Sequence, residues 1–257
     1  MSIIDNQIEK KNFENKEIFN KNYNNSIFIE CNFLNCKFID TFFNNSKFIN
    51  CTIKNCIFIN CEICNSNLNN IKIYNSDLST SILEFASLQD SNLINCKFKL
   101  TNLSKIDLFS AYINGCIFES SILFGANIRS VLIENSTFEK TKLSHAILNN
   151  TNFNNCEIKD IELEEILNSE MPSCLFNKCD FINTTLINMI LDYNKFIECH
   201  FSSINFSGSS LNYTDFNNSK FKNPIFRHAK FRNTFLTNCD IDQSIFELED
   251  IDQINFN

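Results

Sequence analysis

Cysteine and histidine are the residues of this sequence that could hold a metal ion or perform thiol chemistry. The chain has 13 cysteines and three histidines among its 257 residues. Cys61 and Cys64 form a Cys-x-x-Cys pair, a spacing found in zinc and redox sites. None of His145, His200 and His228 falls at ligand spacing from a cysteine. The sequence therefore predicts neither a metal site nor a cofactor.

Catalytic motifs are not visible either. Only three glycines occur, so no glycine-rich phosphate loop can form, and no nucleophile, base and orienting residue stand in a recognisable arrangement. The net charge of −8 also disfavours direct binding to nucleic acid, because an acidic surface repels phosphates. We therefore expect a protein that binds other molecules and is not an enzyme.

The strongest signal in the sequence is a period of five residues. We call each large apolar residue position i. Phe, Leu or Ile occupies it in 28 consecutive repeats from Phe28 to Leu163 and in 15 more from Phe176 to Phe246. Position i−2 holds Ser, Cys, Thr, Ala or Val in 36 of these 43 repeats. Apolar residues repeat at about 3.6 in a helix and at 2 in a strand, so the pattern indicates a repeat architecture.

The period translates directly into a geometry. Side chains alternate along an extended segment, so positions i and i−2 point to one side and positions i−1 and i+1 to the other. A turn at i+2 in every repeat would close a four-sided coil after four repeats. Successive coils would stack by strand pairing at about 4.8 Å, which predicts an all-β solenoid of about 11 coils, a single rod roughly 50 Å long.

The cysteines follow the same period. Twelve of the 13 occupy position i−2, which predicts small buried thiols rather than a disulfide framework. Pairs 20 residues apart, such as Cys36 and Cys56, would stack with parallel side chains, a poor geometry for a disulfide. Cys61 would point inward and Cys64 outward, which weakens the zinc and redox interpretations. We predict free thiols and, because no signal peptide or membrane span is visible, a cytoplasmic location.

This pattern, over residues 26 to 163 and 174 to about 246, resembles that of pentapeptide-repeat proteins, which implies a right-handed quadrilateral β-helix. The opening residues MSIIDNQIEKKNFENKEIFNKNYNNSIF are similar to the start of the microcin-immunity and quinolone-resistance branch of that family. That similarity implies a DNA mimic that binds DNA gyrase or topoisomerase IV, protects it from inhibitors and confers antibiotic resistance. The branch carries two projecting loops and a C-terminal dimer helix, whereas this sequence shows one break and no such tail.

The five-residue pattern fails in three places, which divide the chain. Residues 1–25 are predicted to form an N-terminal cap, because extending the period would place Lys16 and Lys21 at i−2 and bury their charge. Residues 26–163 form a first arm and residues 174–257 a second, whose last coil is expected to fray. Residues 164–173 form a break with three extra residues, or eight if it spans only one repeat step.

Candidate partner-binding residues are acids on the rod and residues in and beside the break. They are Glu119, Glu139, Glu162, Glu164, Glu165 and Met171. Glu119 and Glu139 fall at i+1 on neighbouring coils, but Lys99 and Lys159 occupy the same column above and below them. The acids therefore do not form a continuous stripe.

Two functions stay open at this point. The first is a DNA mimic that binds a topoisomerase, and the second is a protein-interaction scaffold or effector-type solenoid with no topoisomerase role. A continuous negative stripe on the rod would favour the first, and alternating patches of charge the second. A homodimer through the last coil, with contacts at Phe246, Ile251 and Phe256, is a further hypothesis.

Overall fold

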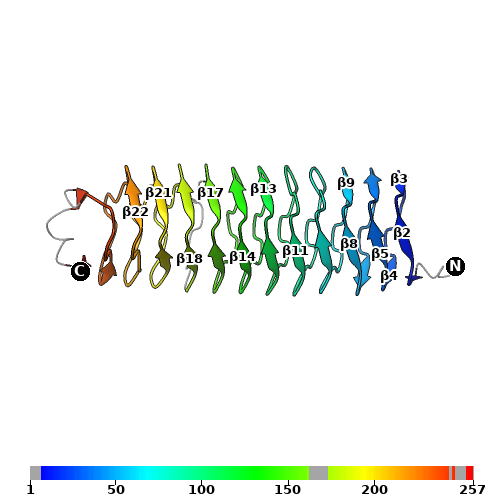
Figure 1. The fold of residues 1–257 in the computed structure, drawn as a ribbon, viewed down its shortest axis with the longest axis horizontal. Coiled ribbons are helices and arrows are strands. Elements are labelled where there is room, and N and C mark those ends of the chain that lie inside the picture. The colour runs from blue at the N-terminus through cyan, green and yellow to red at the C-terminus, as the bar shows by residue number, and fades with distance from the viewer. Residues whose placement is uncertain (1–6, 162–172, 243–244, 247–252, 257) are drawn as a thin grey trace.

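The computed structural model describes residues 7–161, 173–242, 245–246 and 253–256. These residues form an all-β parallel solenoid of about 12 turns, and the chain runs along the rod from one end to the other (Figure 1). Before the break, residues of successive turns pair in parallel with an offset of 20, as Ile8 does with Phe28 and Phe33 with Ile53. The predicted fold class is therefore confirmed.

Each turn has four sides, and most strands cover three residues centred on position i. Side 1 contains β1 (Gln7–Glu9), β4 (Ile27–Ile29) and β7 (Lys47–Ile49). Side 2 contains β2 (Asn12–Glu14), β5 (Asn32–Leu34), β8 (Thr52–Lys54), β10 (Lys72–Tyr74), β11 (Asn92–Ile94), β12 (Tyr112–Asn114), β14 (Leu132–Glu134), β16 (Asn152–Asn154), β18 (Leu175–Asn177), β20 (Lys195–Ile197), β23 (Thr234–Phe235) and β24 (Ile254–Asn255).

Side 3 contains β3 (Glu17–Phe19), β6 (Lys37–Ile39), β9 (Ile57–Ile59), β13 (Ile117–Glu119), β15 (Thr137–Glu139), β17 (Glu157–Lys159), β19 (Asp180–Ile182), β21 (His200–Ser202) and β22 (Lys220–Lys222). On side 4, successive turns are joined by single parallel bridges, such as those that link Ile82 to Asn102 and Asn102 to Ile122.

The residues at position i fill the interior as stacked columns. Phe38 pairs with Phe58, and their rings stack with centroids 4.8 Å apart and an angle of 15° between the planes. Both side chains are buried, and this distance equals the coil spacing expected from strand pairing. Burial of large apolar side chains in contact with one another is the main stabilising term of this fold.

Position i−2 lies beside these columns, where its hydroxyl or thiol donates a hydrogen bond to a carbonyl of the turn before. Cys36 Sγ donates to the carbonyl of Phe13 at 3.3 Å, and Ser66 Oγ donates to the carbonyl of Phe43 at 2.6 Å. All 13 cysteines are free thiols, as predicted. A small polar group fits this position because it satisfies a buried carbonyl without displacing the apolar column.

Position i+2 turns each corner in the left-handed backbone region. Positive φ angles occur at 42 non-glycine residues, and 21 of these are asparagine. Asparagine tolerates this conformation better than other residues with a side chain. Its amides also form a ladder along one corner, where Asn55 Nδ2 donates to Asn35 Oδ1 at 3.1 Å. The corners thus explain why the sequence is rich in asparagine.

The expectation that lysine at i−2 would be buried near the N-terminus is wrong. Strands β1, β2 and β3 pair with β4, β5 and β6 in the same register as later turns, so the repeat begins earlier than predicted. Lys16 and Lys21 are exposed because no described turn precedes theirs. This additional turn accounts for a rod slightly longer than predicted. A capping role for residues 1–25 stays a prediction.

The break changes the residue offset between paired strands, but sides 2 and 3 continue across it. Phe153 pairs with Phe176 and Ile158 with Phe181, an offset of 23 residues where other turns have 20. The break therefore adds three residues, the first of the two alternatives. Residues 162–172 lie outside the described part of the chain.

Candidate partner-binding surface

The two acids predicted on the rod lie together on side 3, but each is paired with a base. Glu119 in β13 lies beside Glu139 in β15. The Lys99 ammonium is 2.7 Å from the Glu119 carboxylate, and Lys159 is 3.0 Å from Glu139. The Glu139 carboxylate raises the pKa of Lys159 through a hydrogen bond and its negative charge. The column therefore runs Lys, Glu, Glu, Lys, and its charges cancel in pairs.

The other outward column of side 3 also contains residues of both signs. Bridges and strand pairs align Asp77 with Lys97, and Glu157 with Asp180 and His200 further along. His200 Nδ1 lies 2.9 Å from Asp180 Oδ1. Across its described residues, side 3 thus carries alternating patches and no continuous negative stripe.

The remaining predicted contact residues are placed as follows. Five of them lie outside the described residues: Glu162, Glu164, Glu165, Met171 and Ile251. Phe246 is buried, with its ring centroid 5.3 Å from that of Phe231 and 5.9 Å from that of Phe256. Phe246 therefore packs in the core of its own chain, and dimerisation through the last coil stays a prediction.

Sequence reasoning missed a group of outward apolar residues on side 4. Leu100 is 57% exposed, Phe85 48%, Phe124 41% and Ile82 37%, and Ile122 beside them is half-buried. We call these five residues the side-4 patch. Ile82 and Ile122 flank Asn102 in one column, Phe124 follows Ile122 by two residues, and Phe85 and Leu100 occupy the two corners that border this side.

Two members of the side-4 patch have an unfavourable backbone conformation. Phe85 has a φ of 58° and Leu100 a φ of 54°, at the corner position where asparagine predominates. A bulky side chain in the left-handed region costs about 1 kcal/mol or more. The fold does not require large apolar residues at these corners, so their presence there points to a role at the surface.

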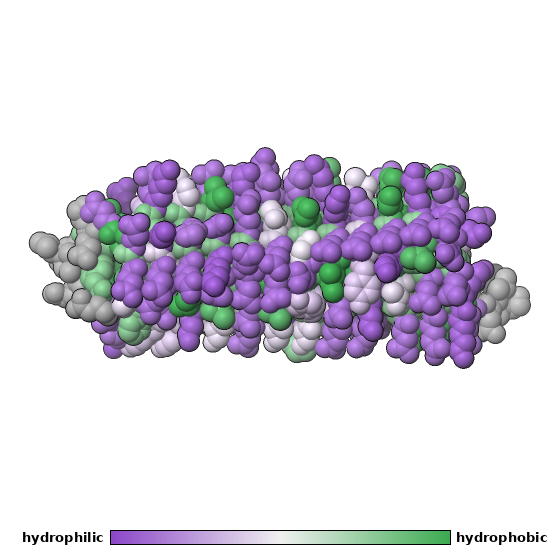
Figure 2. All heavy atoms as spheres, viewed as in Figure 1, coloured by the Kyte–Doolittle hydropathy of each residue, from purple (hydrophilic) through white to green (hydrophobic). Residues whose placement is uncertain are grey.

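Polar side chains border and interrupt the side-4 patch. The Lys105 ammonium lies 4.8 Å from the centre of the Phe85 ring, and the His145 ring packs edge-on against Phe124 at 5.1 Å. In the view of Figure 2, hydrophilic side chains cover most of the rod, and hydrophobic residues appear singly or in small groups. A search of the sequence for large apolar residues at positions i−1, i+1 and i+2 would have identified the patch.

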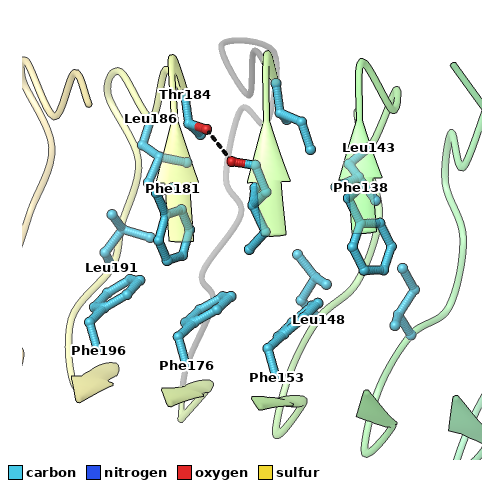
Figure 3. A pocket seen from close by; sticks show the side chains of 13 residues that line it. Phe138, Leu143, Leu148, Phe153, Phe176, Phe181, Thr184, Leu186, Leu191 and Phe196 are labelled. Carbon is cyan, nitrogen blue, oxygen red and sulfur yellow. Dashed lines mark hydrogen bonds between the residues drawn. The ribbon is translucent and has the colours of Figure 1, made fainter. Parts of the chain in front are cut away.

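Described residues on both sides of the break enclose a small void in the interior. Its volume is about 40 Å³, and its walls are apolar side chains of turns on both sides of the break, including Leu143, Leu148 and Leu191 (Figure 3). Thr184 Oγ1 also lines it and donates to the carbonyl of Ile158 at 3.2 Å. A void of this volume holds at most a few water molecules and is too small for an organic ligand.

The Cys-x-x-Cys pair has the geometry expected of structural thiols. Cys61 is buried and Cys64 half-buried, and burial raises the pKa of both, that of Cys61 to about 11. Raised pKa values leave little reactive thiolate at neutral pH. The described residues contain no group of three side chains that could hold a metal ion. They also contain no helix that could span a membrane.

Comparison with known proteins gives a family match and several similar folds. The family described as Pentapeptide repeats matches eight copies over residues 86–123, 121–160 and 199–238. Full-length QnrB1, a plasmid-mediated fluoroquinolone resistance protein, is 12% identical over 96% of this chain and 94% of its own, with a TM-score of 0.47. HetL, from the cyanobacterium Nostoc sp. strain PCC 7120, is 13% identical over 88% and 89%, with a TM-score of 0.35.

The catalytic domain of a GH87 α-1,3-glucanase is 9% identical over 98% of this chain and 63% of its own, with a TM-score of 0.45. No curated protein matches the sequence. The family match covers repeats of both arms, and the same 20-residue register extends over the turns around them. The family model therefore identifies pentapeptide repeats in both arms of this chain, over residues 86–160 and 199–238.

Proposed function

We propose that this protein is a non-enzymatic rod that binds a partner protein through the side-4 patch. The observation that carries the proposal is the grouping of five large apolar side chains on one side of three adjacent turns, two of them at corners that disfavour such residues. Exposed apolar clusters on soluble proteins mark contact surfaces for other proteins. A rigid solenoid supports this use, because its pairing fixes the relative positions of the five side chains.

Contact through apolar side chains fits the charges better than imitation of DNA does. A DNA mimic needs a continuous array of negative charge, whereas Glu119 and Glu139 are each paired with a lysine. The proposal therefore follows the scaffold alternative. DNA gyrase and topoisomerase IV are the first partners to test, because the opening residues resemble proteins that protect these enzymes. A cytoplasmic location belongs to the same proposal.

Binding of purified gyrase and topoisomerase IV to the immobilised protein tests this choice of partner and surface. We expect L100S/F124S to weaken binding at least tenfold, a loss of about 1.4 kcal/mol or more. The matched variant E119Q/E139Q, which removes two charges from side 3, should change it less than twofold. The reverse result would favour DNA imitation and reject the side-4 patch as the contact. No binding of the wild type at micromolar concentration would reject topoisomerases as partners.

A further inference from the structure

The side-4 patch lies in a column of outward residues whose character changes along the rod. Parallel bridges between successive turns place five residues in line, one per turn: Glu62, Ile82, Asn102, Ile122 and Lys142. An acid therefore precedes the patch and a base follows it, while the three residues between them are two isoleucines around one amide. This order gives the patch a direction along the rod axis.

The turns beneath the patch have an axial spacing that an α-helix matches. Stacked rings of successive turns are 4.8 Å apart, so Ile82 and Ile122, which are two turns apart, are separated by about 10 Å along the rod. On one face of an α-helix, residues i+3 or i+4 and i+7 rise by about 5 and 10.5 Å above residue i. A helix that lies along the rod thus places one apolar residue over each of three turns.

An extended strand fits this surface less well. Its side chains on one face repeat about every 6.8 Å, so a strand along the rod would be out of step with the turns after its first contact. Strand addition is not available on side 4 either, because the backbone groups already pair between turns. Asn102 N donates to Ser81 O at 3.0 Å, and Leu103 N donates to Ile122 O at 2.7 Å. The geometry therefore favours a helix.

The charges at the two ends of the patch favour one direction of such a helix. Glu62 precedes the patch and Glu84 lies in its first turn, whereas Lys140 and Lys142 follow it and are both exposed. Lys105 belongs to the middle turn and does not distinguish the ends. A helix carries partial positive charge at its N-terminus and partial negative charge at its C-terminus. The N-terminus should therefore lie toward Glu62 and Glu84.

We propose that the side-4 patch receives an amphipathic α-helix of a partner protein, laid along the rod with its N-terminus toward Glu62 and its C-terminus toward Lys142. This inference rests on the proposed function and adds the structure and direction of the partner segment. Four turns separate Glu62 from Lys142, about 19 Å, which is the length of a helix of about 13 residues. Docking of an apolar helix face is an established mode of peptide recognition.

Photo-crosslinking from positions 82, 102 and 122, one position per variant, tests the fit in cells that express the protein. Mass spectrometry of each adduct identifies the partner residue that reacted. We expect the three residues to belong to one segment, about three or four apart in its sequence, and to increase in number from position 82 to position 122.

The other outcomes separate this inference from the proposed function. Reacting residues about two apart, or in separate segments, would overturn the helix, and decreasing numbers would overturn its direction. No adduct at any of the three positions would reject the side-4 patch as a contact surface, and the inference would fail with it.

Exchange of the end charges tests the direction independently. In the variant E62K/K142E, the yield of the adduct at position 122 should fall roughly threefold or more, because each end then repels the adjacent end of the helix. The matched control K97E/E157K exchanges a base and an acid on side 3 and should keep the wild-type yield. An unchanged yield in E62K/K142E, or an equal fall in the control, would overturn the assigned direction.

Discussion

Phe118 and Phe124 lie six residues apart in the same turn, yet Phe118 is 2% exposed and Phe124 41%. Phe118 occupies position i on side 3 and stacks between Phe98 and Phe138. Phe124 occupies position i+1 on side 4 and faces outward. The comparison shows that position within the five-residue unit, rather than residue type, decides whether a side chain lies in the core or on the surface. Inward residues build the rod, and outward residues decide what each side can bind.

The largest expected effect comes from truncating the inward phenylalanine. Phe118→Ala should lower the free energy of unfolding by about 3–5 kcal/mol, because it leaves a cavity in a stacked column. Phe124→Ala should change it by less than about 0.5 kcal/mol, as for most surface substitutions. Chemical denaturation of both variants measures the difference. Equal losses would mean that the two phenylalanines do not differ as described.

The core behind side 3 and the core behind side 4 should both lose stability at alkaline pH. Burial raises the pKa of Cys56, behind side 3, and of Cys61, behind side 4, to about 11. A raised pKa in the folded state stabilises it fully below the unfolded pKa near 9, and this contribution is lost as pH rises toward 11. Stability should therefore fall over this window. Cys56→Ser and Cys61→Ser should each flatten the fall, and an unchanged slope in both would contradict the burial argument.

Substitution of an outward corner residue should stabilise the fold, whereas substitution of a core residue destabilises it. Leu100→Asn places the preferred residue in the left-handed conformation, so it should raise the free energy of unfolding by up to about 1 kcal/mol. The same change should weaken partner binding, because it removes an apolar contact from the side-4 patch. Thermal denaturation measures the first effect. A clear loss of stability would show that Leu100 serves the fold instead.

The smallest effect is expected on the paired charges of side 3. Glu119→Gln removes an ion pair with Lys99 that is largely exposed, and such pairs contribute roughly 0–1 kcal/mol. Unfolding measured with and without added salt tests this, because salt should already screen the pair in the wild type. A loss comparable to that of Phe118→Ala would mean that side 3 depends on its charges.

The positions of the inward-facing residues are predicted well from the sequence. A single period gives the register, the stacking of Phe38 on Phe58 and the place of the cysteines, because the interior repeats every turn. The outward residues obey no period, so the side-4 patch could not be found by counting repeats. The error at Lys16 and Lys21 has a physical cause, since an i−2 position is buried only where another turn covers it.

A photo-crosslinking amino acid at position 124, in cells that express the protein, tests the central claim most directly. The same amino acid at position 152, an exposed outward position on side 2, serves as the control. We predict a discrete adduct with another protein at position 124 and none at position 152. Matching adducts at both positions, or none at either, would contradict the assignment of the side-4 patch as the contact surface.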